Sequence, residues 1–197
     1  MNHFHKLEYM AQLVLDGSSF GSFVGFIGGG FSFIEGQEGI DGRLCEALYQ
    51  GLRDDNSSLK DLSLVAVGRG PGSHTGTRSV AALGKGLAMA LGIPWKLFPS
   101  LLLHLPEKEG VLGAFIETKQ GAFHLCMYHS LNKEVLCNQE LSKEDFDKRA
   151  HSVEHWGEPS FYTLCHVETF LQKAPLSSLG EPLDYLGTMG NSHFLQL

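Results

Sequence analysis

One order of predicted elements occurs twice in this chain, beginning at residues 11 and 111. Each copy opens with an apolar strand that ends in an acidic residue, Asp16 in "AQLVLD" and Glu117 in "VLGAFIE". A turn, two more strands and an amphipathic helix follow in both places. The two segments show no visible sequence repeat, so the duplication is one of topology. It predicts an α/β protein with two similar halves.

The expected elements follow from hydrophobic periodicity and turn residues. In the first half we expect strands at residues 11–16, 20–27, 31–35 and 62–67, helices at 40–55 and from Thr75 or Arg78 to Leu91, and a strand with a short helix in "WKLFPSLLLHL". In the second half we expect strands at 111–117, 122–128, 134–141 and near 161–164, a helix through Ala150 capped by Ser142, and a helix near 167–173. This arrangement is that of actin-like ATPases and sugar kinases, a ribonuclease H-like architecture. We expect a first domain at residues 1–105 and a smaller, reduced second domain at 106–197.

The composition fits a globular protein, with 43% hydrophobic and 19% charged residues among 197. Its 15 basic and 22 acidic residues give a formal net charge of −7, and the basic residues form no run. Nucleic-acid affinity comes mainly from Lys and Arg neutralising phosphates, so the chain should bind RNA poorly by itself. No apolar run is long enough for a signal peptide or a membrane span, and the cysteines show no CxxC spacing. We expect a cytoplasmic protein with reduced cysteines and no membrane contact.

A loop with four glycines, "GRGPGSHTG" at residues 68–76, precedes a helix rich in small residues. Loops of this kind can cradle phosphate with their backbone N–H groups. This loop lacks the Lys-Ser/Thr of a P-loop and the spacing of a dinucleotide fold, and Pro71 removes one N–H. Ser73 or Thr75 can cap the helix behind it. A phosphate cradle and a structural turn that seats the helix are both open readings at this point.

Two other patterns suggest metal chemistry. Asp16 and Glu117 end equivalent strands, and acidic turns in a duplicated fold can hold Mg²⁺ beside a nucleotide triphosphate. The alternative is that both acids are solvated in turns. The segment "HSVEH" at 151–155 matches the His-x-x-Glu-His pattern of zinc peptidases. Gly157 and Pro159 end any helix at once and no third ligand is evident, so we expect no metal site there.

The stretch "GRGPGSHTGTRSVAALGKGLAMALGIP" resembles the hallmark of the TsaB (YeaZ) family, which runs close to GPGSFTGLR and continues into a small-residue helix and GIP. "LVLDGSS", "FIETKQGAFHLCMY" and "EPLDYLG" resemble three weaker family segments in the same order, so the resemblance covers roughly residues 11–187. The motif here comprises Gly70, Pro71, Gly72, Ser73, Thr75, Gly76 and Arg78. The resemblance implies the actin-like ASKHA fold.

The resemblance also implies a function. Proteins of this family lack catalytic residues and pair with a catalytic paralogue, TsaD, and with the ATPase TsaE. Together these install threonylcarbamoyl on the adenosine beside the anticodon of tRNA. The resemblance therefore implies a non-catalytic partner subunit that dimerises with TsaD and activates it. Such a subunit has no cofactor of its own, since ATP and Mg²⁺ belong to the complex, and it meets tRNA only through that complex. The rival hypothesis is an ATP-binding enzyme of the same fold that uses Asp16 and Glu117 with Mg²⁺.

The family's homodimer and its heterodimer with TsaD both use the first two helices, here about residues 41–53 and 78–91. Helical geometry cannot turn all of their apolar and small residues toward one core, and Gly84 with Ala88 predicts a groove for a partner helix. The expected interface residues are Leu44, Leu48, Leu52, Leu83, Gly84, Leu87 and Ala88.

The chain departs from the family pattern at several positions. His74 and Thr77 replace a Phe and a Leu of the glycine motif, and the Asp-Thr-Ser turn becomes "DGS" at 16–18. "TKQ" at 118–120 replaces Ala-Arg-Arg, and of the HxxxH metal pair found in TsaD only His104 is present. We therefore expect the glycine loop to be a fold element that orients an interface helix.

Overall fold

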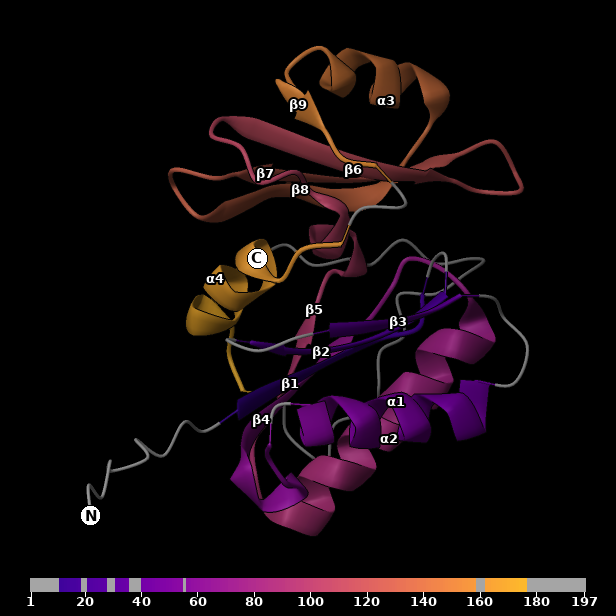
Figure 1. The fold of residues 1–197 in the computed structure, drawn as a ribbon. Helices are drawn as coiled ribbons and strands as arrows, with labels where there is room; N and C mark the ends of the chain where they lie inside the picture. Colours follow the sequence, from indigo (N-terminus) through magenta and orange to yellow (C-terminus); the bar gives the residue numbers. More distant parts are fainter. Residues whose placement is uncertain are drawn as a thin grey trace.

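The computed structural model describes residues 11–18, 21–27, 31–35, 40–54, 56–158 and 162–176. Two β-sheets and their helices stack as successive layers, with one sheet and two helices in the lower part of Figure 1 and the other sheet and one helix in the upper part. The first sheet comes from the first half of the chain and the second from the second half. The expected segments 177–197, including "EPLDYLG", lie outside the described residues.

The first sheet contains the strands β1 (Ala11–Asp16), β2 (Gly21–Ile27), β3 (Phe31–Glu35), β4 (Leu62–Gly68) and β5 (Trp95–Phe98). Their order across the sheet is β3-β2-β1-β4-β5. β1 pairs antiparallel with β2 and parallel with β4, so a meander is extended by crossover strands. The structure thus confirms the predicted three-stranded meander and the predicted positions of the strands in the first half.

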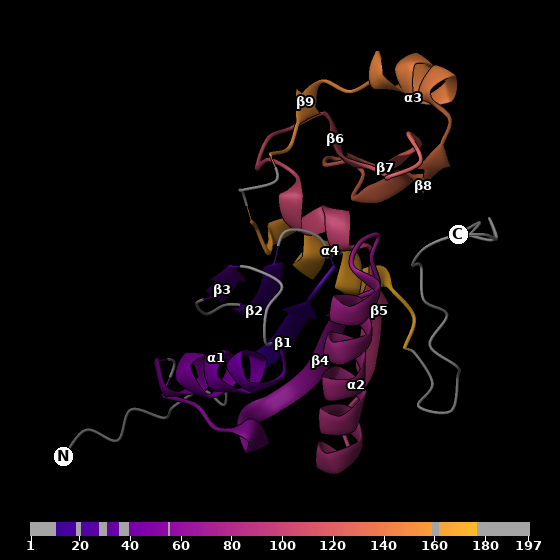
Figure 2. The ribbon, with the colours of Figure 1, turned by 90° about the vertical axis from the view of Figure 1, so that its right-hand side faces the viewer.

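Two helices cover the outer face of this sheet. α1 (Ile40–Asp54) packs on β2 and β3, and α2 (His74–Leu91) packs mainly on β4 and β1, as Figure 2 shows from the side. The four-residue spacing of Leu44, Leu48 and Leu52 places all three on the sheet, where each is at most 3% exposed. Burying a leucine side chain stabilises the fold by about 2 kcal/mol. α2 ends at Gly92, whose φ of 65° is the left-handed conformation favoured at helix ends.

The second sheet repeats this order without a fifth strand among the described residues. Its strands are β6 (Val111–Glu117), β7 (Phe123–His129), β8 (Glu134–Leu141) and β9 (His155–Trp156), in the order β8-β7-β6-β9. β6 is antiparallel to β7 and parallel to β9, as β1 is to β2 and β4. α3 (Lys143–Ala150) packs on β7 and β8, and the Ser142 hydroxyl caps it by accepting from the N–H of Asp145 at 3.1 Å. The duplication and the reduced second half are therefore confirmed.

The two sheets share one core. The short 3-10 helix η2 (Ser100–His104) and α4 (Cys165–Lys173) lie between them, and α4 packs on β5 and η2. Leu102 of η2, Leu112 of the second sheet and Val167 of α4 are all fully buried in the same cluster, together with residues of the first sheet. The halves are thus held together by apolar contact rather than by a linker alone.

The strand expected near residues 161–164 is wrong. Tyr162 and Thr163 are outside any strand, and Leu164 is the N-cap of α4. The Thr163 N–H donates to the carbonyl of Leu103 in η2, so the chain has already left the sheet at this point. The edge strand beside β6 is instead β9, and its two residues are too few to produce a hydrophobic pattern in the sequence.

Among the described residues, no helix is both long and apolar enough to cross a bilayer.

Candidate functional site: the glycine loop and the two outer helices

The glycine loop, residues 68–76, connects the end of β4 to α2 and lies against the turn that follows β1. The Ser73 N–H donates to the carbonyl of Ser18 in that turn. Gly72 has a φ of 153°, and a Cβ at this position would overlap the same carbonyl, so only glycine fits. The Gly70 N–H donates to the hydroxyl of Ser100 at 2.9 Å. Two N–H groups that a phosphate cradle would use are therefore bonded within the protein.

Ser73 rather than Thr75 caps α2. Its side chain accepts from the N–H of Gly76 at 3.2 Å, and its carbonyl accepts from the N–H and hydroxyl of Thr77 at 2.9 and 2.8 Å. Thr75 and Arg78 are exposed on the first turns of the helix, and the Gly70–Pro71 peptide bond is cis. The loop thus fixes where the helix begins.

Asp16 is 1% exposed, and both of its carboxylate oxygens accept hydrogen bonds from the chain itself. Oδ1 accepts from the Ser100 hydroxyl at 2.5 Å, and Oδ2 accepts from the hydroxyl and N–H of Ser18 at 2.8 and 3.2 Å. A Cβ at Gly68 would overlap Oδ1, so the first glycine of the loop makes room for this carboxylate. Because hydrogen bonds to a charged group are the stronger kind, Asp16 ties β1 to the glycine loop and to η2.

Aromatic residues lie next to this carboxylate. Phe23 is the β2 partner of Asp16 in the sheet register, and the ring of Tyr162 stacks on Phe23 with centroids 5.4 Å apart. Burial raises the pKa of the Tyr162 hydroxyl above its ordinary value, and the negative charge of Asp16 raises it further. Tyr162 is therefore protonated throughout the physiological range.

Ser100 is the residue of this network that the sequence analysis missed. Its hydroxyl donates to Asp16 and accepts from Gly70, while its N–H donates to the carbonyl of Gly70 at 3.0 Å. The signal was its position directly after β5, since the carboxyl ends of neighbouring parallel strands lie at one edge of a sheet. Ser100 and the glycine loop follow two such strands, β5 and β4.

Glu117 occupies the equivalent position at the end of β6 but has a different environment. Its side chain is exposed, whereas Asp16 is buried. In the described part of the chain, no group of three or more His, Cys, Asp or Glu side chains is placed to hold a metal ion. Of the two acids, Asp16 is the buried one, and both of its carboxylate oxygens already accept hydrogen bonds from the protein.

The "HSVEH" segment does not lie on a helix. His151 follows the last turn of α3, where its Nδ1 lies 2.6 Å from the carbonyl of Asp147, and His155 belongs to β9. Two imidazoles on one helical face, the geometry of zinc peptidases, are therefore not formed.

Most of the expected interface residues lie against the protein's own core. Leu44, Leu48 and Leu52 face the sheet, and a Cβ at Gly84 would contact Val67. Ala88 is also fully buried, and Leu83 and Leu87 are half-buried against the same core. The small residues at 84 and 88 thus let α2 approach the protein's own strands closely, and the groove predicted between them is filled by the sheet.

The outward faces of the two helices carry other apolar and small residues. Tyr49 of α1 is 54% exposed and Met89 of α2 is 60% exposed. Ala82 and Gly86 are exposed on α2, and a Cβ at Gly86 would have no atom within 4 Å. The sequence contained an indication of this outward face. Ala82 and Gly86 are four residues apart, so they share one face of the helix, and this face differs from the one that carries Ala81 and Ala88.

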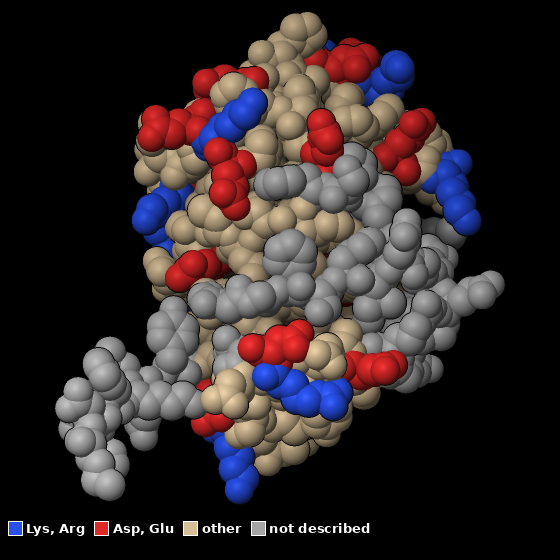
Figure 3. All heavy atoms as spheres, in the orientation of Figure 1, with Lys and Arg blue, Asp and Glu red and all other residues tan. Residues whose placement is uncertain are grey.

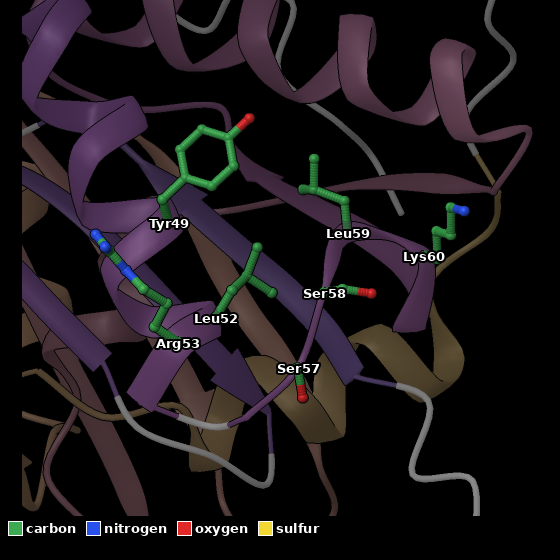
Figure 4. A pocket seen from close by; sticks show the side chains of 7 residues that line it. All are labelled: Tyr49, Leu52, Arg53, Ser57, Ser58, Leu59 and Lys60. Carbon is green, nitrogen blue, oxygen red and sulfur yellow. The ribbon is translucent and has the colours of Figure 1, made fainter.

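An open pocket of about 480 Å³ adjoins Tyr49, where α1 meets the short 3-10 helix η1 (Leu59–Asp61). Figure 4 shows its walls coming from the end of α1 and from the segment that follows it. The lining residues are Tyr49, Leu52, Arg53, Ser57, Ser58, Leu59 and Lys60. The pocket has apolar side chains and two cations in its lining. It would therefore fit an apolar group that has an acidic group next to it.

Comparison with known proteins agrees with the motif. A family model described as "TsaD: tRNA N6-adenosine threonylcarbamoyltransferase" matches residues 42–177. The tRNA threonylcarbamoyladenosine biosynthesis protein TsaB of Bacillus subtilis (strain 168) is 28% identical over 110 residues, which are 53% of this chain and 48% of that protein. TsaB of Buchnera aphidicola subsp. Baizongia pistaciae (strain Bp) is 28% identical over 65 residues, 33% of this chain and 29% of that protein. The chain thus spans about half the length of the first of these relatives, and less of the second.

Two solved structures from Pseudomonas aeruginosa have a similar fold. One, an uncharacterized protein with similarity to peptidase YeaZ, superposes with a TM-score of 0.68 at 18% identity, covering 82% of this chain and 90% of that one. The other, YeaZ, superposes with a TM-score of 0.63 at 16% identity and the same coverage. At such identities the likeness establishes the fold alone. With the family model matching most of its length, the chain belongs to the TsaD family, in its TsaB (YeaZ) branch, and has the actin-like ASKHA fold.

Proposed function

We propose that this chain is a non-catalytic partner subunit in the biosynthesis of threonylcarbamoyladenosine, the modified adenosine beside the anticodon of tRNA. In this proposal it dimerises with a TsaD-like catalytic paralogue in the cytoplasm and activates it, and a TsaE-like ATPase completes the assembly. Support comes from the names of its TsaB relatives and from the resemblance of residues 70–78 to the glycine motif of the TsaB (YeaZ) family.

The observation that carries the non-catalytic part is the environment of Asp16. A carboxylate that binds Mg²⁺ needs free oxygen lone pairs directed at the ion. Here Ser100 and Ser18 donate to both oxygens, and the residue is 1% exposed. Binding Mg²⁺ would require breaking this network and opening the loop. We propose that Asp16, at the position where an actin-like ATPase would bind Mg²⁺ and nucleotide, has only a structural role in this chain. ATP and Mg²⁺ would then be bound by its partners.

The surface available for a partner is the outward side of α1 and α2. Tyr49 and Met89 supply large apolar anchors, while Ala82 and Gly86 lower the surface of α2 so that another helix can approach closely. The pocket beside Tyr49, with Arg53 and Lys60 on its rim, would receive an apolar side chain next to an acidic one. We propose that the dimer forms through this side, and a homodimer through the same side is the alternative when the paralogue is absent.

Transfer RNA would then be met only through the complex. The net charge of −7 leaves little positive surface, and Figure 3 shows scattered rather than continuous Lys and Arg side chains on the face it displays. Few phosphates could be neutralised at once by such a surface. No shift of a labelled tRNA by the chain alone is expected at about 0.15 M salt. A tight complex under those conditions would assign the chain a direct RNA-binding role.

Calorimetry separates this proposal from the rival, an ATP-binding enzyme that uses Asp16 and Glu117. The isolated chain should show no heat of binding with millimolar Mg-ATP and should hydrolyse none. In a reconstituted reaction, formation of threonylcarbamoyladenosine by the TsaD-like paralogue and the TsaE-like ATPase should depend on adding the chain. Tight Mg-ATP binding by the chain alone, or full activity without it, would refute the non-catalytic partner role.

A further inference from the structure

Four aromatic side chains form a cluster on the outer face of the second sheet, and we call it the aromatic cluster. It consists of Phe115 on β6, Phe123 on β7, Phe146 on α3 and Trp156 on β9. Phe123 stacks on Phe146 with centroids 4.5 Å apart, and Phe115 meets Phe146 at 5.0 Å. The rings of Trp156 and Phe115 make a T-shaped contact with centroids 5.5 Å apart. The rings therefore hold one another in fixed orientations.

The strand register explains why these rings gather. Phe115 lies two residues beyond Gly113 on one face of β6, and Gly113 is the register partner of Trp156. A Cβ at Gly113 would lie 2.9 Å from the methyl groups of Val153 and 3.0 Å from the indole, so glycine allows both side chains to pack closely on the strand. Phe123 is the partner of Glu117, which is also two residues from Phe115 and so on the same face.

The cluster is only partly covered. Phe115 is 42% exposed and Trp156 is 38% exposed, although both are among the largest apolar side chains. In the first half, α2 covers the equivalent strands β1 and β4. In the second half, α3 packs on β7 and β8, and the helix that follows β9 in the described chain, α4, packs between the sheets instead. The outer side of β6 and β9 is therefore left with aromatic rings where the first half has a helix.

The exposed side chains next to Phe115 and Trp156, at the open side of the cluster, are acidic. Glu117 shares one face of β6 with Phe115, and Glu158 follows Trp156 by two residues, both with exposed side chains. On α3, the exposed Lys143 and Arg149 lie three residues to either side of Phe146. Lys148, a cation on the same helix, already pairs with Glu144 at 2.8 Å. Carboxylates repel phosphate backbones but attract Arg and Lys, which also bind the faces of aromatic rings.

We propose that the aromatic cluster docks a basic amphipathic helix of a partner protein, in the position that α2 occupies in the first half. Aliphatic side chains of that helix would pack on Phe115 and Trp156, and its Arg or Lys side chains would lie over the rings and against Glu117 and Glu158. The site is on the half of the molecule that the proposed interface with a TsaD-like paralogue does not use. The two proposals can therefore fail independently.

The test uses the full chain and a synthetic peptide of about 20 residues, long enough to form a helix alone, with Leu and Arg on one face. We expect it to change the fluorescence of Trp156, because Trp95 is only 1% exposed. The Phe115→Ala and Glu117→Lys variants should each weaken binding about tenfold. Tyr49→Ala, which removes an exposed aromatic ring from the first half, is the matched control and should bind as the wild type does.

Three further results would overturn the proposal. One is equal binding of a peptide in which Glu replaces every Arg, and another is preferential binding of a single-stranded oligouridylate, which would make the cluster an RNA-stacking surface. The third is self-association of the wild type that Phe115→Ala abolishes, which would make a second copy the occupant. Should Phe115→Ala fail to fold, Glu117→Lys decides, because that side chain is exposed and unchanged peptide affinity in this variant would refute the proposal.

Discussion

The two halves of this protein have the same strand order but use it differently. In the first half, two helices cover the outer face of the sheet, and the acidic residue at the end of its first strand, Asp16, is buried under the glycine loop. In the second half, one helix covers part of the outer face, and the corresponding Glu117 is exposed. Both acids lie opposite a phenylalanine in the register, Phe23 and Phe123, so the backbone frame is equivalent.

This difference shows that a topology can persist while its site does not. In the first half, the acidic residue at the end of the first strand holds the neighbouring segments together by hydrogen bonds, because glycines and Ser100 enclose it. In the other half no such enclosure exists, and the carboxylate is solvated. The first half thus has a sheet whose outer face is covered by two helices, whereas the second half leaves aromatic side chains partly exposed on the outer face of its sheet.

The largest expected effect contrasts two positions on α2. Ala88→Arg would bury a charge against the sheet, and we expect a loss of more than about 4 kcal/mol or no folded protein. Gly86→Arg, two residues away, should fold with equal or slightly higher stability, gaining up to about 1 kcal/mol of helix propensity. Circular dichroism and thermal melts compare them. A stable, folded Ala88→Arg protein would mean that α2 does not face the sheet as described.

The two acids at the strand ends form the next comparison. Asp16→Ala should lower the free energy of unfolding by about 3 kcal/mol, because it leaves the donors on Ser18 and Ser100 unsatisfied. Glu117→Ala should change it by less than about 0.5 kcal/mol, since that side chain is exposed. Urea unfolding measures both. Equal effects would remove the distinction between a locked and a solvated acid.

Acid should act on the second half through His124 of β7. Burial lowers the pKa of this imidazole to about 4, below its ordinary value of about 6.5. Between these values the unfolded chain binds the proton and the folded chain does not, so stability falls as the pH drops through this window. The loss from this group is about 2 kcal/mol at pH 5. Urea midpoints at pH 7 and pH 5 should therefore move closer together in His124→Phe, and an unchanged difference would contradict the assignment.

The smallest effects concern the helix caps. Ser73→Ala, at the start of α2, should cost about 1–2 kcal/mol, because the hydroxyl accepts from Gly76 within a partly buried loop. Ser142→Ala, at the exposed start of α3, should cost about 0.5–1 kcal/mol. Chemical unfolding resolves this difference, and a larger cost at Ser142 would reverse the relative importance of the two helices.

Most of the fold could be predicted from the sequence because its signals are local. The structure confirms the strands predicted to end at Asp16 and Glu117 and the helix predicted from the four-residue spacing in α1. β9 could not be predicted, because a two-residue strand is defined by its hydrogen-bonded neighbour β6 and not by its own composition. The position of α4 between the sheets likewise depends on tertiary packing.

The candidate site was harder to predict than the fold. Glycines at 68, 70 and 72 indicated close backbone approach, but what approaches, namely Asp16 and Ser18, is set by long-range contacts. Gly84 and Ala88 were expected to face a partner helix but lie against the sheet, and the sequence could not show this because small residues at a helix surface and small residues under a sheet give the same pattern. Only the burial of Ala88 beside the exposure of Gly86 distinguishes them.

The most direct test of the proposed role is the mass of the complex formed with the TsaD-like paralogue of the same organism, measured by size-exclusion chromatography with light scattering. The wild type should form a heterodimer, and Gly86→Arg should remain a folded, separate chain because it places a long cation on the outward face of α2. Gln120→Arg, which adds the same side chain to an exposed turn of the second half, should associate as the wild type does. A heterodimer formed equally well by folded Gly86→Arg would contradict the account.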